Sequence, residues 1–140
     1  MRLGLTGRDR DRLDGVAREC EAKGASVESV SLDIRDHEHL LAWLERFDEA
    51  HPVDLLIANA GVMHAARKAA PVEPREVIKE ILDVNFNGVI DTANPLLERM
   101  RSRGRGSVAI ISSLSAYHGT PRFPAYAASK AALRSYYEAV

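Results

Sequence analysis

A tyrosine, a lysine and a serine in the last third of the chain have the spacing of a proton-transfer site. Tyr126 and Lys130 are four residues apart, and Ser113 lies thirteen residues before Tyr126. Four residues make about one helical turn, so a phenol and an ammonium at this spacing project from the same face of a helix. A nearby cation favours the phenolate and lowers the pKa of a tyrosine, and a serine hydroxyl can hold a carbonyl or alcohol oxygen. The three groups therefore suit proton transfer coupled to oxidation or reduction of a C–O centre.

Alternating strand and helix patterns surround these residues. Short apolar runs predict strands at 2–6, 26–32, 53–58 and 106–112. Amphipathic patterns predict helices over 10–23, from the N-cap Asp36 to about 49, over 74–100 with a bend near 85–88, and from 124 onward. The first helix is expected to turn Leu13, Val16, Ala17 and Cys20 inward and to end at Gly24. Such alternation indicates βαβ crossovers, an α/β fold with a mainly parallel sheet, and one domain over residues 1–140.

Composition and charge argue against several classes of function. The 140 residues carry 19 basic and 20 acidic side chains, so a net charge of −1 favours neither nucleic acid nor a membrane surface. No stretch approaches the length of a membrane span, and the N-terminus lacks an apolar signal core, so we expect a cytoplasmic protein. Cys20 is the only cysteine and the five histidines show no metal-ligand spacing, so we expect no disulfide and no metal.

Further motifs accompany the tyrosine and lysine in a definite order. Asn59-Ala60-Gly61 follows the third predicted strand, Asn85-Phe86-Asn87-Gly88 lies in the long predicted helix, and Ser112-Ser113 follows the fourth strand. Together with the YxxxK pair, these motifs resemble the short-chain dehydrogenase/reductase family over the whole chain. That family consists of NAD(P)-dependent oxidoreductases, so the resemblance implies a Rossmann-type, doubly wound parallel sheet.

The resemblance implies a role for each of four residues. Tyr126 would be the general acid/base that gives a proton to the carbonyl oxygen or takes one from the alcohol. Lys130 would bind the nicotinamide ribose hydroxyls and lower the tyrosine pKa, and Ser113 would hydrogen-bond the substrate oxygen. Asn85 would anchor a water in a proton relay toward Lys130. Alone, Asn85 is better explained as a satisfied amide inside a helix, but the accompanying motifs favour the functional role.

The resemblance also implies two groups of cofactor-binding residues. Asn59, Ala60 and Gly61 end a strand at the carboxyl edge of the sheet, where open α/β sheets bind ligands and where glycine permits close approach. Asp33 and Ile34 follow the second strand at the place where the family contacts adenine. The Asp33 carboxylate can accept from the adenine amino group, and Asp36 is better placed to cap the next helix.

Arg8 bears on the choice between the two nicotinamide cofactors. The strand end that usually offers a carboxylate to the ribose 2′-hydroxyl reads Thr6-Gly7-Arg8 in this chain. An arginine there, with no carboxylate at Gly7, accommodates a 2′-phosphate, so we expect NADP(H) to be favoured over NAD(H). Asp9 and Asp11 are alternative partners for the same guanidinium.

Two parts of the family pattern are missing from the sequence. The family opens with a strand and a glycine-rich TGxxxGxG turn that binds the pyrophosphate, and no GxG follows Thr6-Gly7-Arg8. The sequence also stops inside the helix of Tyr126 and Lys130, before the segments that usually shape the substrate pocket. We therefore expect an incomplete sheet without its first and last strands, and a fragment that alone is weakly active or inactive. Without its first strand, the sheet loses the bridge between its two halves.

Two alternatives to this reading remain. A nucleotide-sugar epimerase or dehydratase of the extended branch shares YxxxK, although Asn59-Ala60-Gly61 and the 85–88 motif argue against it. A non-catalytic remnant that binds only a nucleotide or a partner chain is the other. For the oxidoreductase, the resemblance implies a small-molecule carbonyl or alcohol substrate of unspecified identity, and a homodimer or homotetramer for a complete chain.

Overall fold

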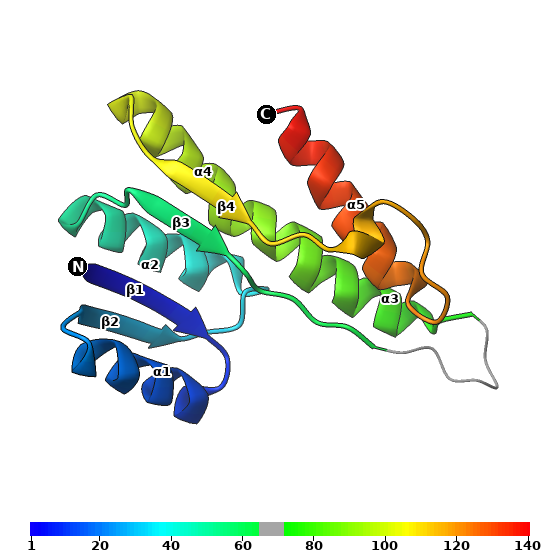
Figure 1. Cartoon of the computed structure of the whole chain (residues 1–140), viewed down its shortest axis with the longest axis horizontal. Coiled ribbons are helices and arrows are strands. Elements are labelled where there is room, and N and C mark those ends of the chain that lie inside the picture. Colours follow the sequence, from blue (N-terminus) through cyan, green and yellow to red (C-terminus); the bar gives the residue numbers. More distant parts are fainter. Residues whose placement is uncertain (65–71) are drawn as a thin grey trace. The chain divides into compact units, whose positions relative to one another are not determined.

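A computed structural model of the chain describes residues 1–64 and 72–140 (Figure 1). Pro71, which the sequence places in a loop, lies outside the described residues. The chain divides into two compact units, Met1–Pro52 and Val53–Val140. Each unit contains a pair of parallel strands, and the two pairs form separate sheets. The predicted α/β class with parallel strands is confirmed, as is the expected break between the first two and last two strands.

The first unit has the order strand, helix, strand, helix. Its elements are β1 (Arg2–Gly7), α1 (Arg10–Ala22), β2 (Ser26–Ser31) and α2 (His37–Ala50). Asp9 caps α1 by accepting from the Arg12 N–H at 3.0 Å. Asp36 caps α2 by accepting from the His39 N–H at 3.4 Å, as predicted. Gly24 follows α1 with a φ of 86°, a left-handed conformation that suits glycine at a helix end.

The two helices of the first unit cover opposite faces of its sheet (Figure 1). A Cβ on Gly4 would lie 2.9 Å from the Phe47 ring of α2, whereas one on Gly7 would meet Leu13 of α1 at 3.7 Å. Residues an odd number of positions apart on a strand face opposite sides. Val16 of α1 is 49% exposed, so the prediction that it turns inward is wrong. Of this helix only Leu13 is buried, so the packing reaches that part of the apolar stripe and leaves Val16 in solvent.

The second unit carries the remaining elements. These are β3 (Leu55–Ala58), α3 (Arg75–Leu82), the π-helical segment η1 (Asp83–Asn87), α4 (Gly88–Arg103), β4 (Ser107–Ile110), the 3-10 turn η2 (Leu114–Ala116) and α5 (Pro124–Glu138). Helix α4 runs along β3 and β4, and α3 packs against α5 (Figure 1). Ala58, Val89 and Leu133 form the buried centre between the strands and helices.

The long predicted helix is interrupted where the sequence predicted a bend. A π-helical turn over Asp83–Asn87 separates α3 from α4. Such turns widen the helix by one residue and occur often at functional sites. Asn85 lies in this turn, so the irregularity coincides with a predicted site residue.

Candidate active site

Tyr126 and Lys130 lie together on one face of α5. The helix begins at Pro124, which suits a first helical position because its ring fixes φ and it has no N–H to satisfy. The Lys130 Nζ lies 6.0 Å from the centre of the Tyr126 ring. Lys130 is buried and Tyr126 is half-buried. The juxtaposition predicted from the four-residue spacing is therefore present.

Lys130 reaches from α5 to the end of β4. Its Nζ donates to the carbonyl oxygen of Ile111, the residue after β4, at 2.7 Å. Only 3% of Lys130 is exposed, and burial lowers its pKa because removal from water disfavours the charged form. An ammonium has three N–H donors, so this lysine can bind hydroxyl groups of a ligand in addition to the Ile111 carbonyl.

Asn85 fastens the loop after β3 to α5. Its fully buried side chain accepts from the Val62 N–H at 2.7 Å and donates to the Val62 carbonyl at 2.9 Å. The same amide nitrogen is 3.1 Å from the Ser129 Oγ, and that hydroxyl donates to the Tyr126 carbonyl at 2.7 Å. Asn85 thus orders both the loop and the backbone of the tyrosine. Its predicted part in a water relay stays a prediction.

Gly61 brings the loop after β3 against the lysine and the asparagine. A Cβ on Gly61 would lie 3.5 Å from the Asn85 Oδ1 and 3.6 Å from the Lys130 Nζ. We call Gly61, Asn85, Tyr126 and Lys130 the carboxyl-edge cluster, because the loops after β3 and β4 meet there. Ligands of open α/β sheets bind at this edge. Upstream, Asn59 is exposed and Ala60 is half-buried.

Ser113 lies on the loop that follows β4, two residues after the carbonyl that Lys130 binds. It is half-buried and caps the short turn η2, where its Oγ accepts from the Ser115 N–H at 3.1 Å. A hydroxyl that accepts one hydrogen bond can still donate its own proton. The predicted bond from Ser113 to a substrate oxygen is compatible with this role and stays a prediction.

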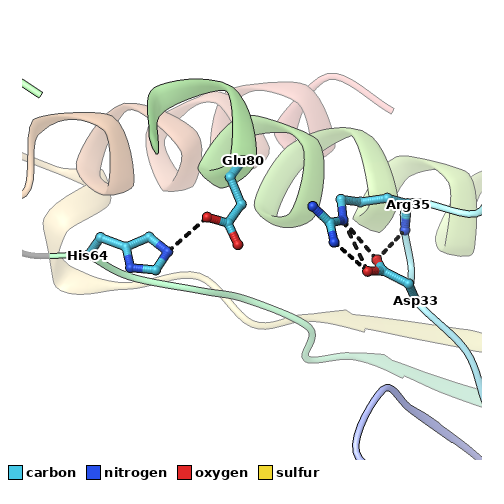
Figure 2. Close-up of polar contacts among 4 residues, drawn as sticks. All are labelled: Asp33, Arg35, His64 and Glu80. Atoms are coloured by element: carbon cyan, nitrogen blue, oxygen red, sulfur yellow. Dashed lines mark hydrogen bonds and ion pairs between the residues drawn. The ribbon is translucent and has the colours of Figure 1, made fainter. Parts of the chain in front are cut away.

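The predicted adenine-contacting residue, Asp33, holds an arginine that sequence reasoning missed (Figure 2). The Arg35 side chain binds both carboxylate oxygens, with its Nε 2.9 Å from Oδ1 and its Nη2 2.5 Å from Oδ2. The Arg35 backbone N–H also donates to Asp33 at 3.0 Å. These hydrogen bonds lower the pKa of Asp33 to about 2, and the charge of Arg8 acts in the same direction. The sequence signal that could have indicated this ion pair is the Asp-x-Arg spacing just after a strand.

The other predicted residues of the first unit lie near the strand ends. Arg8 follows β1 and is exposed, while Ile34 lies beside Asp33 and is half-buried. Asp9, one of the alternative partners of Arg8, caps α1 instead. Arg8, Asp33 and Ile34 belong to the unit Met1–Pro52, whereas the carboxyl-edge cluster and Ser113 belong to Val53–Val140.

Sequence reasoning also missed two carboxylates of the second unit. The Glu80 Oε2 lies 3.2 Å from the His64 Nε2 at a partly exposed position (Figure 2). The Glu73 Oε2 accepts from the Ala125 N–H at 2.8 Å, at the start of the helix that carries Tyr126. Neither carboxylate belongs to a recognisable motif, because each contacts a residue that is distant in the sequence.

A cavity of about 520 Å³ lies between the loop 115–121 and α5. On the helix it is lined by Pro124, Ala127, Ala128 and Ala131, a different face from that of Tyr126 and Lys130. Its position therefore does not place a bound molecule against the phenol.

Within residues 1–64 and 72–140, no helix is long and apolar enough to cross a membrane. The same residues contain no group of three or more metal-ligating side chains.

Comparison with known proteins relates this arrangement to one family. The family model described as short chain dehydrogenase matches residues 1–140. An uncharacterized oxidoreductase of Myxococcus xanthus is 34% identical over 141 residues, which cover 100% of this chain and 55% of that protein. Human 17-beta-hydroxysteroid dehydrogenase type 1 is 33% identical over 92% of this chain and 38% of its own length.

A solved structure shows the same fold. The crystal structure of a putative NAD(P) dependent gluconate 5-dehydrogenase from Beutenbergia cavernae, with bound NADP at low occupancy, superposes with a TM-score of 0.82. It is 30% identical, and the match covers 91% of this chain and 50% of that one. The chain thus spans about half the length of the first relatives that it matches.

Proposed function

We propose, since this chain belongs to the short-chain dehydrogenase family, that its carboxyl-edge cluster serves hydride transfer between NAD(P)(H) and a carbonyl or secondary alcohol carbon. The observation that carries the proposal is the buried Lys130 ammonium. It lies 6.0 Å from the centre of the Tyr126 ring and is held in place by the Ile111 carbonyl. A fixed cation beside a phenol favours the phenolate, and proton transfer requires that form on one side of the reaction.

The proposed roles follow from the positions of the side chains. A bound nicotinamide would supply the hydride to the carbonyl carbon or accept it from the alcohol. Tyr126 would give its phenolic proton to the carbonyl oxygen in reduction, and would take the hydroxyl proton in oxidation. Lys130 would stabilise the phenolate and bind ribose hydroxyls through its remaining N–H groups. Ser113 would hold the substrate oxygen, and Asn85 would keep Tyr126 in place and anchor the relay water.

For the cofactor, we propose NADP(H) in preference to NAD(H). The support is Arg8, an exposed arginine just after β1, while Asp9, one of its alternative partners, caps α1. The structure of the putative gluconate 5-dehydrogenase to which the chain is similar contains NADP at low occupancy. Asn59, Ala60 and Gly61 would contact the same cofactor, and Asp33 and Ile34 would contact its adenine. The sequence contains no TGxxxGxG turn, so we also propose weak affinity and slow turnover for the 140-residue chain by itself.

The substrate would be a small carbonyl compound or alcohol. The relatives differ here, since one is a steroid dehydrogenase and another a putative gluconate dehydrogenase. For a complete protein of this family type we propose a homodimer or homotetramer.

Deuteride transfer from 4-deuterated NADPH to a panel of aldehydes and ketones tests the proposal. Mass spectrometry detects the labelled alcohol even when turnover is slow. We expect Tyr126→Phe to abolish the transfer while NADPH binding, followed by NMR, is retained. Tyr117→Phe removes a hydroxyl from an exposed tyrosine and serves as the matched control. Transfer at the wild-type rate by Tyr126→Phe would exclude this role, and binding without any transfer would favour a non-catalytic remnant.

A further inference from the structure

We propose that Glu73 is a positioning residue for Tyr126 and that it acts through the first turn of α5. This inference rests on the proposed role of Tyr126 as acid and base. Glu73 is 6% exposed, although glutamates are almost never so deeply buried unless they are paired. Its Oε2 accepts from the Ala125 N–H at 2.8 Å. The Tyr126 backbone follows directly, so the carboxylate holds the peptide next to the proposed acid and base.

The first turn of α5 has no side-chain cap of its own. The N-cap residue Phe123 makes no capping hydrogen bond, and Pro124 has no N–H to donate. The first N–H groups of a helix have no partner within the helix, and such a group is costly to bury when it stays unpaired. Glu73 satisfies the Ala125 N–H from a point 52 residues earlier in the sequence. A carboxylate at this end is also favoured by the helix dipole.

Glu73 also ties α5 to the start of another helix. It immediately precedes Pro74, the N-cap residue of α3. The backbone of Tyr126 is therefore held from two directions. Glu73 fixes the preceding peptide, while Ser129 donates to the Tyr126 carbonyl at 2.7 Å and is itself bound by Asn85. Lys130 is fixed separately at Ile111. Release of the first turn would therefore move the phenol while the ammonium kept its anchor.

The second carboxylate oxygen separates this role from simple core packing. Among the described residues, the buried Glu73 Oε1 has no hydrogen-bond partner. A residue kept only to fill space would be replaced better by an apolar side chain, because an unpartnered polar atom is costly to bury. The geometry instead assigns the side chain to its hydrogen bond with the Ala125 N–H. The carbonyl oxygen of a glutamine can make the same bond, whereas alanine cannot.

Glu73→Ala, Glu73→Gln and the control Glu76→Ala test this in the isotope-labelled 140-residue chain. Glu76 is an exposed acid in the first turn of α3. We expect Glu73→Ala to speed hydrogen exchange of the Ala125 amide roughly fivefold to tenfold, the factor for one lost hydrogen bond, and to shift the Tyr126 ring resonances. Glu73→Gln should restore most of both signals, and Glu76→Ala should leave both unchanged.

The same variants are then compared in the deuteride-transfer assay. We expect Glu73→Ala to lower kcat with little change in the KM for NADPH, because the phenol and not the cofactor contact is displaced, and Glu73→Gln to restore kcat. Unchanged Ala125 exchange and Tyr126 resonances in Glu73→Ala would overturn the inference. The inference would also be overturned if Glu73→Gln were as defective as Glu73→Ala, or if both variants failed to fold. Failure of the proposed function has a different signature, namely transfer that Tyr126→Phe does not affect.

Discussion

Replacing Asn85 by alanine should destabilise the unit Val53–Val140 by about 3–5 kcal/mol. The side chain is fully buried and makes three hydrogen bonds, at 2.7 and 2.9 Å to the Val62 backbone and at 3.1 Å to the Ser129 hydroxyl. At roughly 1 kcal/mol each, these bonds account for about 3 kcal/mol. The cavity and the groups left unpaired add to that value. Val62 is only half-buried, so in the variant water can bind part of its backbone. This hydration limits the destabilisation to the upper end of the stated range.

Asn87 provides the matched control for this substitution. It lies in the same π-helical turn but is exposed, and its amide donates to the Asp83 carboxylate at 3.2 Å. Asn87→Ala removes the same chemical group from the same segment at a surface position. We expect it to cost about 0.5 kcal/mol or less. The difference between the two variants therefore isolates the buried contacts of Asn85.

The assay must report on the correct unit. Trp43, the only tryptophan, lies on α2 of the first unit, so its fluorescence follows Met1–Pro52. Hydrogen exchange of amides within Val53–Val140, measured against urea, reports on the second unit. If the free energies of unfolding of Asn85→Ala and Asn87→Ala differed by less than about 1 kcal/mol, the reasoning would be refuted. Loss of a buried amide with three hydrogen-bond partners should destabilise the unit by more than that. Faster exchange at the Val62 amide would locate the effect.

Three further predictions concern Gly4, Asp33 and Lys130. Gly4→Ala places a Cβ 2.9 Å from the Phe47 ring and should cost roughly 1–3 kcal/mol; an unchanged urea midpoint by Trp43 fluorescence would contradict this close approach. The pKa of Asp33 is lowered to about 2 by Arg35, so its contribution to stability is complete above 3.8 and is lost as the pH falls through 2. Because the Asp33 side chain is 35% exposed, that contribution should be at most ~1 kcal/mol. NMR titration should show Arg35→Met returning the Asp33 midpoint toward 3.8, and an unmoved midpoint would count against the pair. Burial lowers the pKa of Lys130 below its ordinary 10.5, so the unfolded state binds more protons just below that pH. Stability should therefore rise with pH there, and a Lys130→Met variant that keeps the same slope would disprove this source.

The local elements could be predicted because their signals are local. Asp36 has the residue type and the position of an N-cap, and it caps α2 as predicted. Tyr126 and Lys130 share a helical turn, so their juxtaposition followed from spacing alone. Val16 was placed wrongly because periodicity defines an apolar stripe on the helix but not which of its members other elements cover.

The contacts that shape the site could not be predicted because they join distant segments. Nothing near Glu73 in the sequence indicates that it caps a helix 52 residues later. The predicted bend near Asn85 did not specify a π-helical turn, since a shift of the apolar pattern by one residue fits a bend as well as a widened turn. The resemblance assigned Asn85 to a water relay, which stays a prediction; it gave no sign that the amide would bind the Val62 backbone and Ser129.

Titration of the isotope-labelled chain with NADPH and, separately, NADH tests the central claim most directly. NMR resolves individual amides and detects binding even at millimolar affinity. We predict saturable shifts of the Gly61 and Lys130 amide resonances in the wild-type chain, and loss of the Gly61 shift in Lys130→Met. NADPH should bind more tightly than NADH and should shift the Arg8 amide more. The absence of saturable shifts at millimolar cofactor, or shifts that Lys130→Met leaves unchanged, would contradict the account.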